Sequence, residues 1–119
     1  MAQPREFLPL APVAFEVLLA LAGRRQHGYG IIIDIRTRTS GAMDLATSTL
    51  YATLQRLEDS GLVAESAARV ADQSSGPPRK YYELTRVGRQ VALLELARLE
   101  RATMQARRRF REQAFGSVR

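Results

Sequence analysis

Three short stretches decide how this chain folds: HGYG at residues 27–30, TSTLYATLQRLEDSGLV at 47–63 and GPPRKYYELTRVG at 76–88. The middle stretch has the clearest helical pattern, because Leu50, Leu54 and Leu57 recur at spacings of four and three. Thr47 is the expected N-cap, and Gly61 stands where a left-handed residue closes a helix. We therefore expect an amphipathic helix over 47–61.

The segments on either side predict a second helix and a hairpin. Ile31 and Ile35 are four residues apart, and charged residues fall mostly on the other side, which favours a short helix from about Tyr29 to Arg38. The alternative is a buried strand, since three consecutive isoleucines have high β propensity. Residues 62–66 and 81–84 are typical of short strands, and the polar, Gly/Pro-rich segment between them predicts a hairpin connection.

Two further helices are expected at the ends of this region. The first begins near Ala11, where Pro12 suits a first-turn position, and stops at Gly23. The last begins after its predicted cap, Thr85, and continues to about Ala114, which makes it about 43 Å long at 1.5 Å per residue.

These elements predict a fold class that is mostly α with a small β-hairpin. Helix, helix and basic hairpin in this order form a winged helix-turn-helix, an architecture that binds DNA. We expect a flexible arm at 1–9, a DNA-binding domain at 10–85 and a C-terminal dimerisation helix at 86–119. A domain this small cannot cover the long apolar stripe of that helix, so a partner chain is the simplest cover. The predicted stripe comprises Val87, Val91, Leu94, Leu99, Ala106 and Phe110.

Composition excludes several classes of site. The 119 residues include no cysteine, which rules out disulfides, thiolate metal sites and cysteine nucleophiles and favours the cytoplasm. His27 is the only histidine, and no neighbouring serine or carboxylate pattern supports a catalytic triad around it. We therefore expect no enzyme activity, no metal and no cofactor. His27 is expected to be structural, donating a hydrogen bond at the start of a helix.

The charge of the chain indicates its partner. Eighteen Lys and Arg residues against 12 Asp and Glu give a formal charge of +6, which favours a polyanionic partner such as nucleic acid or an anionic membrane surface. No apolar run is long enough to span a bilayer, and the N-terminus does not read as a signal peptide. We expect double-stranded DNA, and no membrane, as the partner.

Candidate DNA contacts lie on the 47–61 helix and on the hairpin. Readout of the major groove requires small or hydrogen-bonding side chains on the outward face of a helix. An ordinary amphipathic surface helix and a solvated polar loop are the alternatives. Tyr29 either packs or offers its hydroxyl to a phosphate. The predicted DNA-binding residues are Tyr29, Ser48, Thr49, Tyr51, Thr53 and Arg56, together with Arg79 and Lys80 at the hairpin tip.

Three segments together resemble the PadR family of transcriptional regulators: LAPVAFEVLLALAGRRQHGYGIIIDI at 10–35, STLYATLQRLEDSGLV at 48–63 and RKYYELTRVGRQV at 79–91. The resemblance implies a homodimeric repressor on a palindromic operator, with one C-terminal dimerisation helix. It places Tyr29, Thr49, Tyr51, Arg56, Arg79 and Lys80 where family members contact DNA. The chain departs from the family pattern at Thr47–Ser48, where Pro-Gly is common, and at Ala52, where proline is frequent.

The resemblance also implies control by a small molecule, because family members often release DNA when a small aromatic or drug-like compound binds. Tryptophans stack on that compound in some members, and this chain has none. An effector pocket would instead use Phe7, Phe15, Phe110 or apolar aliphatic side chains. The rival interpretation is a small-molecule-binding dimer whose DNA binding is weak or lost.

Overall fold

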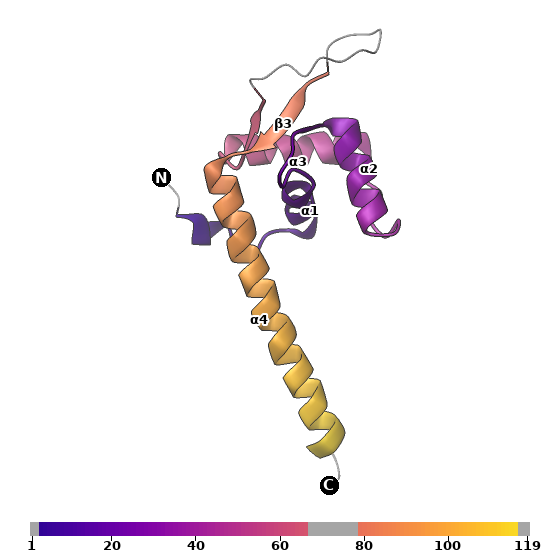
Figure 1. Ribbon diagram of the computed structural model, residues 1–119, viewed down its shortest axis with the longest axis vertical. Helices are drawn as coiled ribbons and strands as arrows, with labels where there is room; N and C mark the ends of the chain where they lie inside the picture. Colours follow the sequence, from indigo (N-terminus) through magenta and orange to yellow (C-terminus); the bar gives the residue numbers. More distant parts are fainter. Residues whose placement is uncertain (1–2, 67–78, 117–119) are drawn as a thin grey trace.

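The structure is a computed structural model, which describes residues 3–66 and 79–116. Its elements, in chain order, are η1 (Pro4–Phe7), α1 (Pro12–Ala20), β1 (Gln26–His27), α2 (Gly28–Arg38), α3 (Thr47–Asp59), β2 (Val63–Glu65), β3 (Tyr81–Leu84) and α4 (Arg86–Gly116). The strands form one antiparallel sheet in the order β1–β3–β2. Helices, sheet and long final helix have the arrangement expected for a winged helix-turn-helix, so the predicted fold class is confirmed (Figure 1).

The helix pair α2 and α3 agrees with the sequence pattern, with one correction at a cap. The isoleucine run is helical, and Ile31 and Ile35 are fully buried, which excludes the strand alternative. Gly61 closes α3 with a φ of +78°, as expected. Thr47, however, is the first helical residue and not the N-cap. Ala46 occupies the cap position in an extended conformation, and no side chain caps the helix there.

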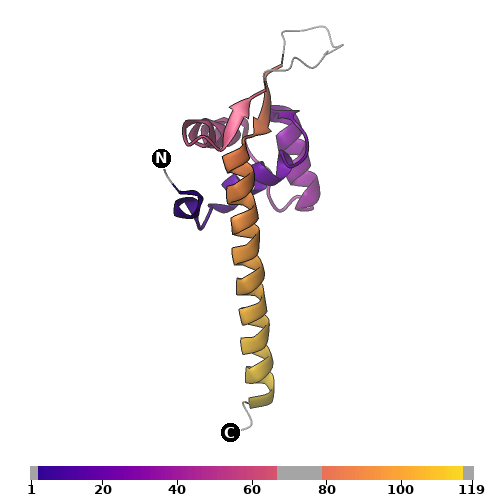
Figure 2. The ribbon, with the colours of Figure 1, turned by 60° about the vertical axis from the view of Figure 1, so that its left-hand side comes forward.

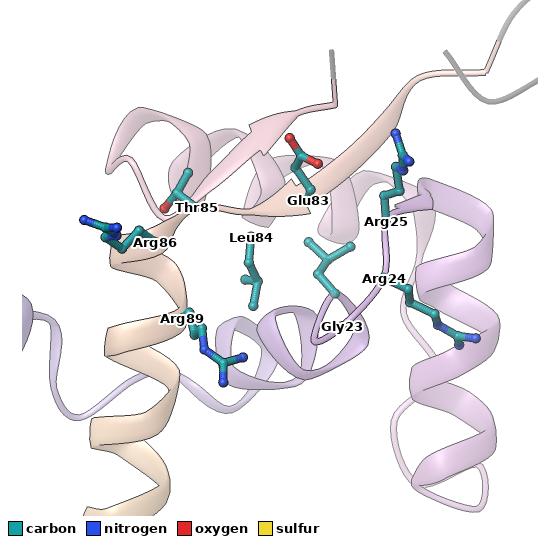
Figure 3. A pocket seen from close by; sticks show the side chains of 9 residues that line it. Gly23, Arg24, Arg25, Glu83, Leu84, Thr85, Arg86 and Arg89 are labelled. Atoms are coloured by element: carbon teal, nitrogen blue, oxygen red, sulfur yellow. The ribbon is translucent and has the colours of Figure 1, made fainter. Parts of the chain in front are cut away.

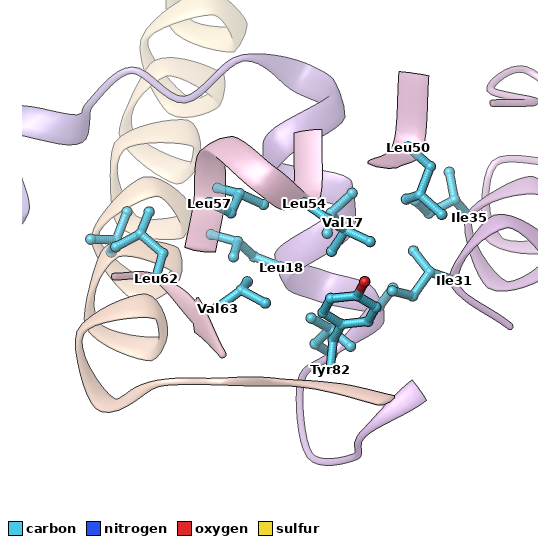
Figure 4. Packing of buried hydrophobic residues seen from close by; sticks show 13 residues of the cluster. Val17, Leu18, Ile31, Ile35, Leu50, Leu54, Leu57, Leu62, Val63 and Tyr82 are labelled. Carbon is cyan, nitrogen blue, oxygen red and sulfur yellow. The ribbon is translucent and has the colours of Figure 1, made fainter. Parts of the chain in front are cut away.

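The hydrophobic core is built around α1. Val17 and Leu18 are fully buried, and Figure 4 shows side chains from α2, α3 and the sheet packed around them. Leu50, Leu54 and Leu57 form the inward stripe of α3, as predicted, and Tyr82 of β3 is 3% exposed in the same cluster. This core fixes α3 with its opposite face toward solvent.

Strand β1 was not predicted. It consists of two residues, and Gln26 and His27 pair with Tyr82 and Tyr81 of β3. Two residues are too few to show the alternation by which a strand is recognised in a sequence. The predicted hairpin strands are present as β2 and β3, although β2 is shorter than the expected 62–66. The predicted connection lies outside the described residues over 67–78, whereas Arg79 and Lys80, which were predicted at its tip, are described.

The N-terminal arm corrects a second expectation. Residues 4–7 form a 3-10 helix, and Phe7, Leu8 and Leu10 pack against the core, so this part of the arm is not loose. The backbone N–H of Leu10 donates to the carboxylate of Glu95 on α4 at 3.1 Å. Arg98 donates to the same carboxylate, which is 2% exposed. The hydrogen bond from Leu10 to Glu95 thus attaches the end of the arm to α4, and Arg98 holds the Glu95 carboxylate in place.

Helix α4 belongs to the domain in its first half and extends away from it in its second. Thr85 caps it as predicted, because its hydroxyl accepts from the N–H of Gly88 at 3.0 Å. Gly88 has no room for a side chain, since a Cβ there would overlap the carbonyl oxygen of Leu62. The second half of α4 extends away from the rest of the chain (Figure 2). From residue 101 to 114 every side chain is exposed. The radius of gyration is accordingly 17.8 Å, against about 13–14 Å for a compact domain of this length.

Candidate nucleic-acid interface

The outward face of α3 carries most of the polar residues predicted for DNA contact. Ser48, Thr49, Tyr51 and Arg56 are exposed. Thr53 is not: its side chain is buried, and its hydroxyl donates to the carbonyl oxygen of Thr49 at 2.9 Å. The prediction that Thr53 faces outward is therefore wrong. Position 53 is three residues after Leu50 and four before Leu57, which places it on the inward stripe.

Gln55 is an exposed residue of this face that the sequence reasoning missed. It lies four residues after Tyr51, on the same side of α3, and its amide donates to Asp59 at 2.9 Å. The helical spacing from Tyr51 was the signal that could have identified it. A glutamine amide can donate and accept together, which is the pattern that an adenine edge presents in the major groove.

Tyr51 connects α3 to the start of α2. Gly28, the first residue of α2, is buried, and a Cβ on it would overlap the hydroxyl of Tyr51. The next residue, Tyr29, is 64% exposed, so its ring does not pack in the core and its hydroxyl is accessible to a ligand. Gly28 therefore lies against Tyr51 of α3 and directly precedes Tyr29 at the N-terminus of α2.

His27 connects α2 to the sheet. Its Nδ1 accepts from the backbone N–H of Gly30 at 3.0 Å, so the ring caps α2. The predicted structural role at the helix start is correct, but this nitrogen accepts and does not donate. Its Nε2 lies 2.9 Å from Nη1 of Arg79, and its ring meets that of Tyr81 edge-on, with the centroids 5.4 Å apart. Arg79 therefore lies beside the N-terminus of α2.

The cations predicted at the hairpin tip lie at its base, directly before β3. Arg79 and Lys80 are both exposed. The amine of Lys80 is 3.6 Å from the carboxylate of Glu65 and 5.6 Å from the ring centre of Tyr82. Tyr82, when ionised, and Glu65 raise the pKa of Lys80. Such an exposed ion pair contributes about 0–1 kcal/mol, so a phosphate could replace Glu65 at low cost.

Arg25 is a further cation near this base that the prediction omitted. Its guanidinium donates to the hydroxyl of Ser66, at the end of β2, at 3.2 Å. The dipeptide Arg24–Arg25, two residues before the HGYG motif, was the available signal. Arg25, Arg79 and Lys80 therefore add positive charge at the end of the sheet that leads into 67–78.

A hollow of about 510 Å³ lies between the end of α1, β3 and the start of α4 (Figure 3). Leu84 points into it and the side chain of Arg89 extends below Leu84, whereas Arg24 and Arg86 point away. Arg24 is instead paired with Asp34 at 3.4 Å. Because the arginines do not converge, the hollow has no concentrated positive charge.

The three phenylalanines proposed for an effector pocket do not line this hollow, and one chain does not bring them together. Phe7 packs against the core, whereas Phe110 is 71% exposed. The arm that carries Phe7 contacts α4 at Glu95. Phe110 lies fifteen residues further along α4, which is about 22 Å along a helix. Phe15 lies on α1, within the domain.

The predicted dimerisation stripe on α4 divides into two parts. Val91 is fully buried and Val87 packs on the core, so these two residues stabilise their own chain. Leu94 and Leu99 are half-buried, and Ala106 and Phe110 are exposed. Three further apolar side chains that the stripe omitted are also exposed, namely Leu93, Leu96 and Met104.

The described residues contain no group of three or more potential metal-ligating side chains of the histidine, cysteine or acidic types. Within the same part of the chain, no helix is both long and apolar enough to cross a membrane.

Comparison with protein families and known sequences gives two matches. The sequence model of the transcriptional regulator PadR-like family matches residues 17–93. An uncharacterised protein from Lysinibacillus sphaericus is 34% identical over 73 residues, which cover 61% of this chain and 64% of that protein. The chain thus spans slightly less than two thirds of that relative.

Solved structures share the fold. A PadR family transcription regulator from Clostridium difficile is 28% identical with a TM-score of 0.62, over 84% of this chain and 98% of that one. A transcriptional regulator from Clostridium thermocellum is 22% identical with a TM-score of 0.66, over 87% and 90%. Bacillus subtilis PadR, solved in complex with operator DNA, is 23% identical with a TM-score of 0.62, over 74% of this chain and 48% of that one.

Proposed function

This chain belongs to the PadR-like family of transcriptional regulators, and we propose that it is a cytoplasmic, homodimeric repressor that binds a palindromic operator in double-stranded DNA. Bacillus subtilis PadR, which shares the fold, was solved with operator DNA. The family and the fold support the proposal that the chain is a DNA-binding regulator. The contacts of α3 and the apolar stripe of α4 support its finer parts.

The observation that carries the proposal is a continuous chain of contacts from α3 to the sheet. Tyr51 lies against Gly28, which follows His27, and His27 lies beside Arg79. The exposed face of α3 is therefore joined by direct contacts to Arg79, at the base of the hairpin of β2 and β3, which is the wing. A recognition helix with an adjacent phosphate-binding wing is what major-groove binding by this architecture requires.

The second half of α4 supports the homodimer. Successive residues of a helix are rotated by about 100°, so positions spaced alternately by three and four share one side. Small or apolar residues occupy one such stripe: Leu96, Leu99, Thr103, Ala106 and Phe110. Polar residues occupy the opposite one: Arg101, Gln105, Arg108 and Glu112. Since the domain of the same chain does not reach residues 101–114, a second α4 is the cover that we propose for the apolar stripe.

Two-fold symmetry in the dimer determines the form of the operator. Two copies of α3 would enter successive major grooves on one face of the duplex, with half-sites about 34 Å apart or a multiple of it. The test is to select duplexes from a random pool with the full-length protein and to determine the stoichiometry on the selected site. We expect an inverted repeat that binds two chains. Enrichment of no sequence would contradict the proposal and favour the small-molecule-binding alternative.

A further inference from the structure

Two hydrogen-bond donors meet at the junction between α2 and the wing. One is the N–H of Gly30, in the first turn of α2, which donates to Nδ1 of His27. The other is the guanidinium of Arg79, whose Nη1 lies 2.9 Å from Nε2 of the same ring. A neutral imidazole has one N–H and one acceptor nitrogen. It therefore accepts from only one of these two groups at a time.

The backbone determines which nitrogen accepts. The N–H of Gly30 is fixed by the backbone of α2, whereas the guanidinium of Arg79 is at the end of a long, exposed side chain. Nδ1 is then the acceptor, and the ring proton is on Nε2. The ring itself is held in place by Tyr81, whose plane is inclined at 81° to it. With the proton on Nε2, two donor nitrogens stand 2.9 Å apart and cannot hydrogen-bond to each other. An acceptor group that reaches both nitrogens would satisfy both donors.

We propose that His27 and Arg79 together bind one phosphate of the DNA backbone, with phosphate oxygens accepting from Nε2–H and from Nη1–H. A phosphate has enough acceptor oxygens for both donors, and the guanidinium supplies the charge. The pair adjoins Gly28 and the accessible Tyr29, next to the exposed face of α3. This inference rests on the proposed function for the source of the phosphate. Inorganic phosphate has the same chemistry and is the second source to be tested.

Two substitutions of His27 separate its cap from its donor. His27→Asn keeps a good N-cap acceptor for Gly30 but has no donor at the position of Nε2. His27→Gln has a longer side chain with an amide donor but is not a preferred cap. If His27 contacts a phosphate, the His27→Asn protein should bind both operator and random duplexes about tenfold more weakly than the wild type. Its folding stability should stay close to that of the wild type. His27→Gln should be less stable and bind more tightly than His27→Asn.

Salt dependence distinguishes His27 from its cationic neighbour. Arg79→Ala should reduce the slope of log affinity against log salt by about 0.9, because one phosphate charge is no longer neutralised. His27→Asn should leave the slope unchanged, because a neutral imidazole releases no counterion. Wild-type duplex affinity in His27→Asn would show that the histidine only caps α2, and would overturn the inference.

The ring can also be observed directly in the unmodified protein, because His27 is the only histidine and its signals need no assignment. Nitrogen NMR at about pH 8, where an ordinary imidazole is neutral, should show the Nε2–H tautomer in the free protein. Addition of duplex should shift the Nε2–H proton downfield and slow its exchange, and inorganic phosphate should do so more weakly.

The other possible results each contradict a different step of the inference. An Nδ1–H tautomer in the free protein overturns the donor pair, whether or not DNA binds. A shift with inorganic phosphate but none with a bound duplex overturns the assignment to the DNA backbone. If the wild-type protein binds no duplex at all, the proposed function fails, and the tautomer and the inorganic phosphate titration still decide the inference.

Discussion

The hydroxyl of Tyr51, on α3, occupies the space that a Cβ on Gly28, at the start of α2, would fill. This contact sets how closely the two helices of the helix-turn-helix approach each other. It gives a reason for glycine at the second position of HGYG that does not depend on backbone conformation, since Gly28 is not among the residues with a positive φ. The same contact fixes the position of a tyrosine that we propose touches DNA.

Gly28→Ala should therefore displace the side chain of Tyr51 and destabilise the fold by about 1–3 kcal/mol. The free energy of unfolding in urea measures this effect. In a Tyr51→Ala background the same substitution should cost little, because the overlapping atoms are gone. Equal costs in the two backgrounds would show that Tyr51 and Gly28 do not interact.

The attachment of the arm to α4 predicts a dependence of stability on pH. Hydrogen bonds from Arg98, and one from the N–H of Leu10, hold the pKa of Glu95 below its usual value despite burial of the carboxylate. A carboxyl with a lowered pKa in the fold contributes stability above its unfolded pKa of about 4.3 and loses it as the pH falls through the folded pKa. Unfolding free energy should thus fall below about pH 4.3.

Glu95→Gln tests this attribution. It should cost about 1.5–3 kcal/mol at pH 7, the range for hydrogen bonds to charged groups. The difference between the two proteins should shrink as the pH falls through the folded pKa of Glu95, because the wild-type carboxyl becomes neutral as well. A difference that stays constant from pH 7 to pH 3 would exclude Glu95 as the source.

The sequence allowed most of the fold to be predicted, because leucine and isoleucine spacing is a local signal and α2, α3 and α4 are long enough to show it. It failed where the determinant lies elsewhere in the chain. Strand β1 exists because β3 pairs with it, and the N-terminal arm is ordered because Glu95, more than eighty residues away, binds it. Neither partner can be identified from its neighbours in the sequence.

The candidate site shows the same division. The exposed positions of α3 followed from the leucine stripe. Thr53 was predicted to face outward because its side chain is polar, although its spacing from Leu50 and Leu57 places it on the buried side of the helix. The stripe on α4 was overextended, since a long apolar pattern does not reveal where its own domain ends. Val91 on the near part and Phe110 on the far part have the same chemistry but different surroundings.

The assignment of the dimer seam is tested by one pair of substitutions on α4. Leu96→Arg places a charge in the proposed seam and should convert the dimer to a monomer in sedimentation at micromolar concentration. Gln105→Arg places the same charge on the polar stripe and is the matched control, which should remain dimeric. A monomeric wild-type protein, or dimers for both variants, would contradict this seam.

Arg56 and Leu54 separate DNA contact from folding within α3. Arg56 is exposed, and its guanidinium makes a long hydrogen bond of 3.5 Å to the hydroxyl of Thr53, so Arg56→Ala should leave the thermal transition nearly unchanged. We expect it to lose about 1–3 kcal/mol of operator binding if it reaches a base. Leu54→Ala should instead destabilise the fold by about 2–5 kcal/mol. Unaltered operator affinity in Arg56→Ala would remove Arg56 from the interface.

The central claim, that this chain binds double-stranded DNA through α3 and a basic wing, is tested most directly by the salt dependence of duplex affinity. Fluorescence anisotropy with the selected duplex, between 50 and 200 mM salt, measures it. A dimer that contacts roughly 6–10 phosphates should lose about 10³–10⁵ in affinity over this range. An affinity that does not change with salt, or no binding at 50 mM, would contradict the account.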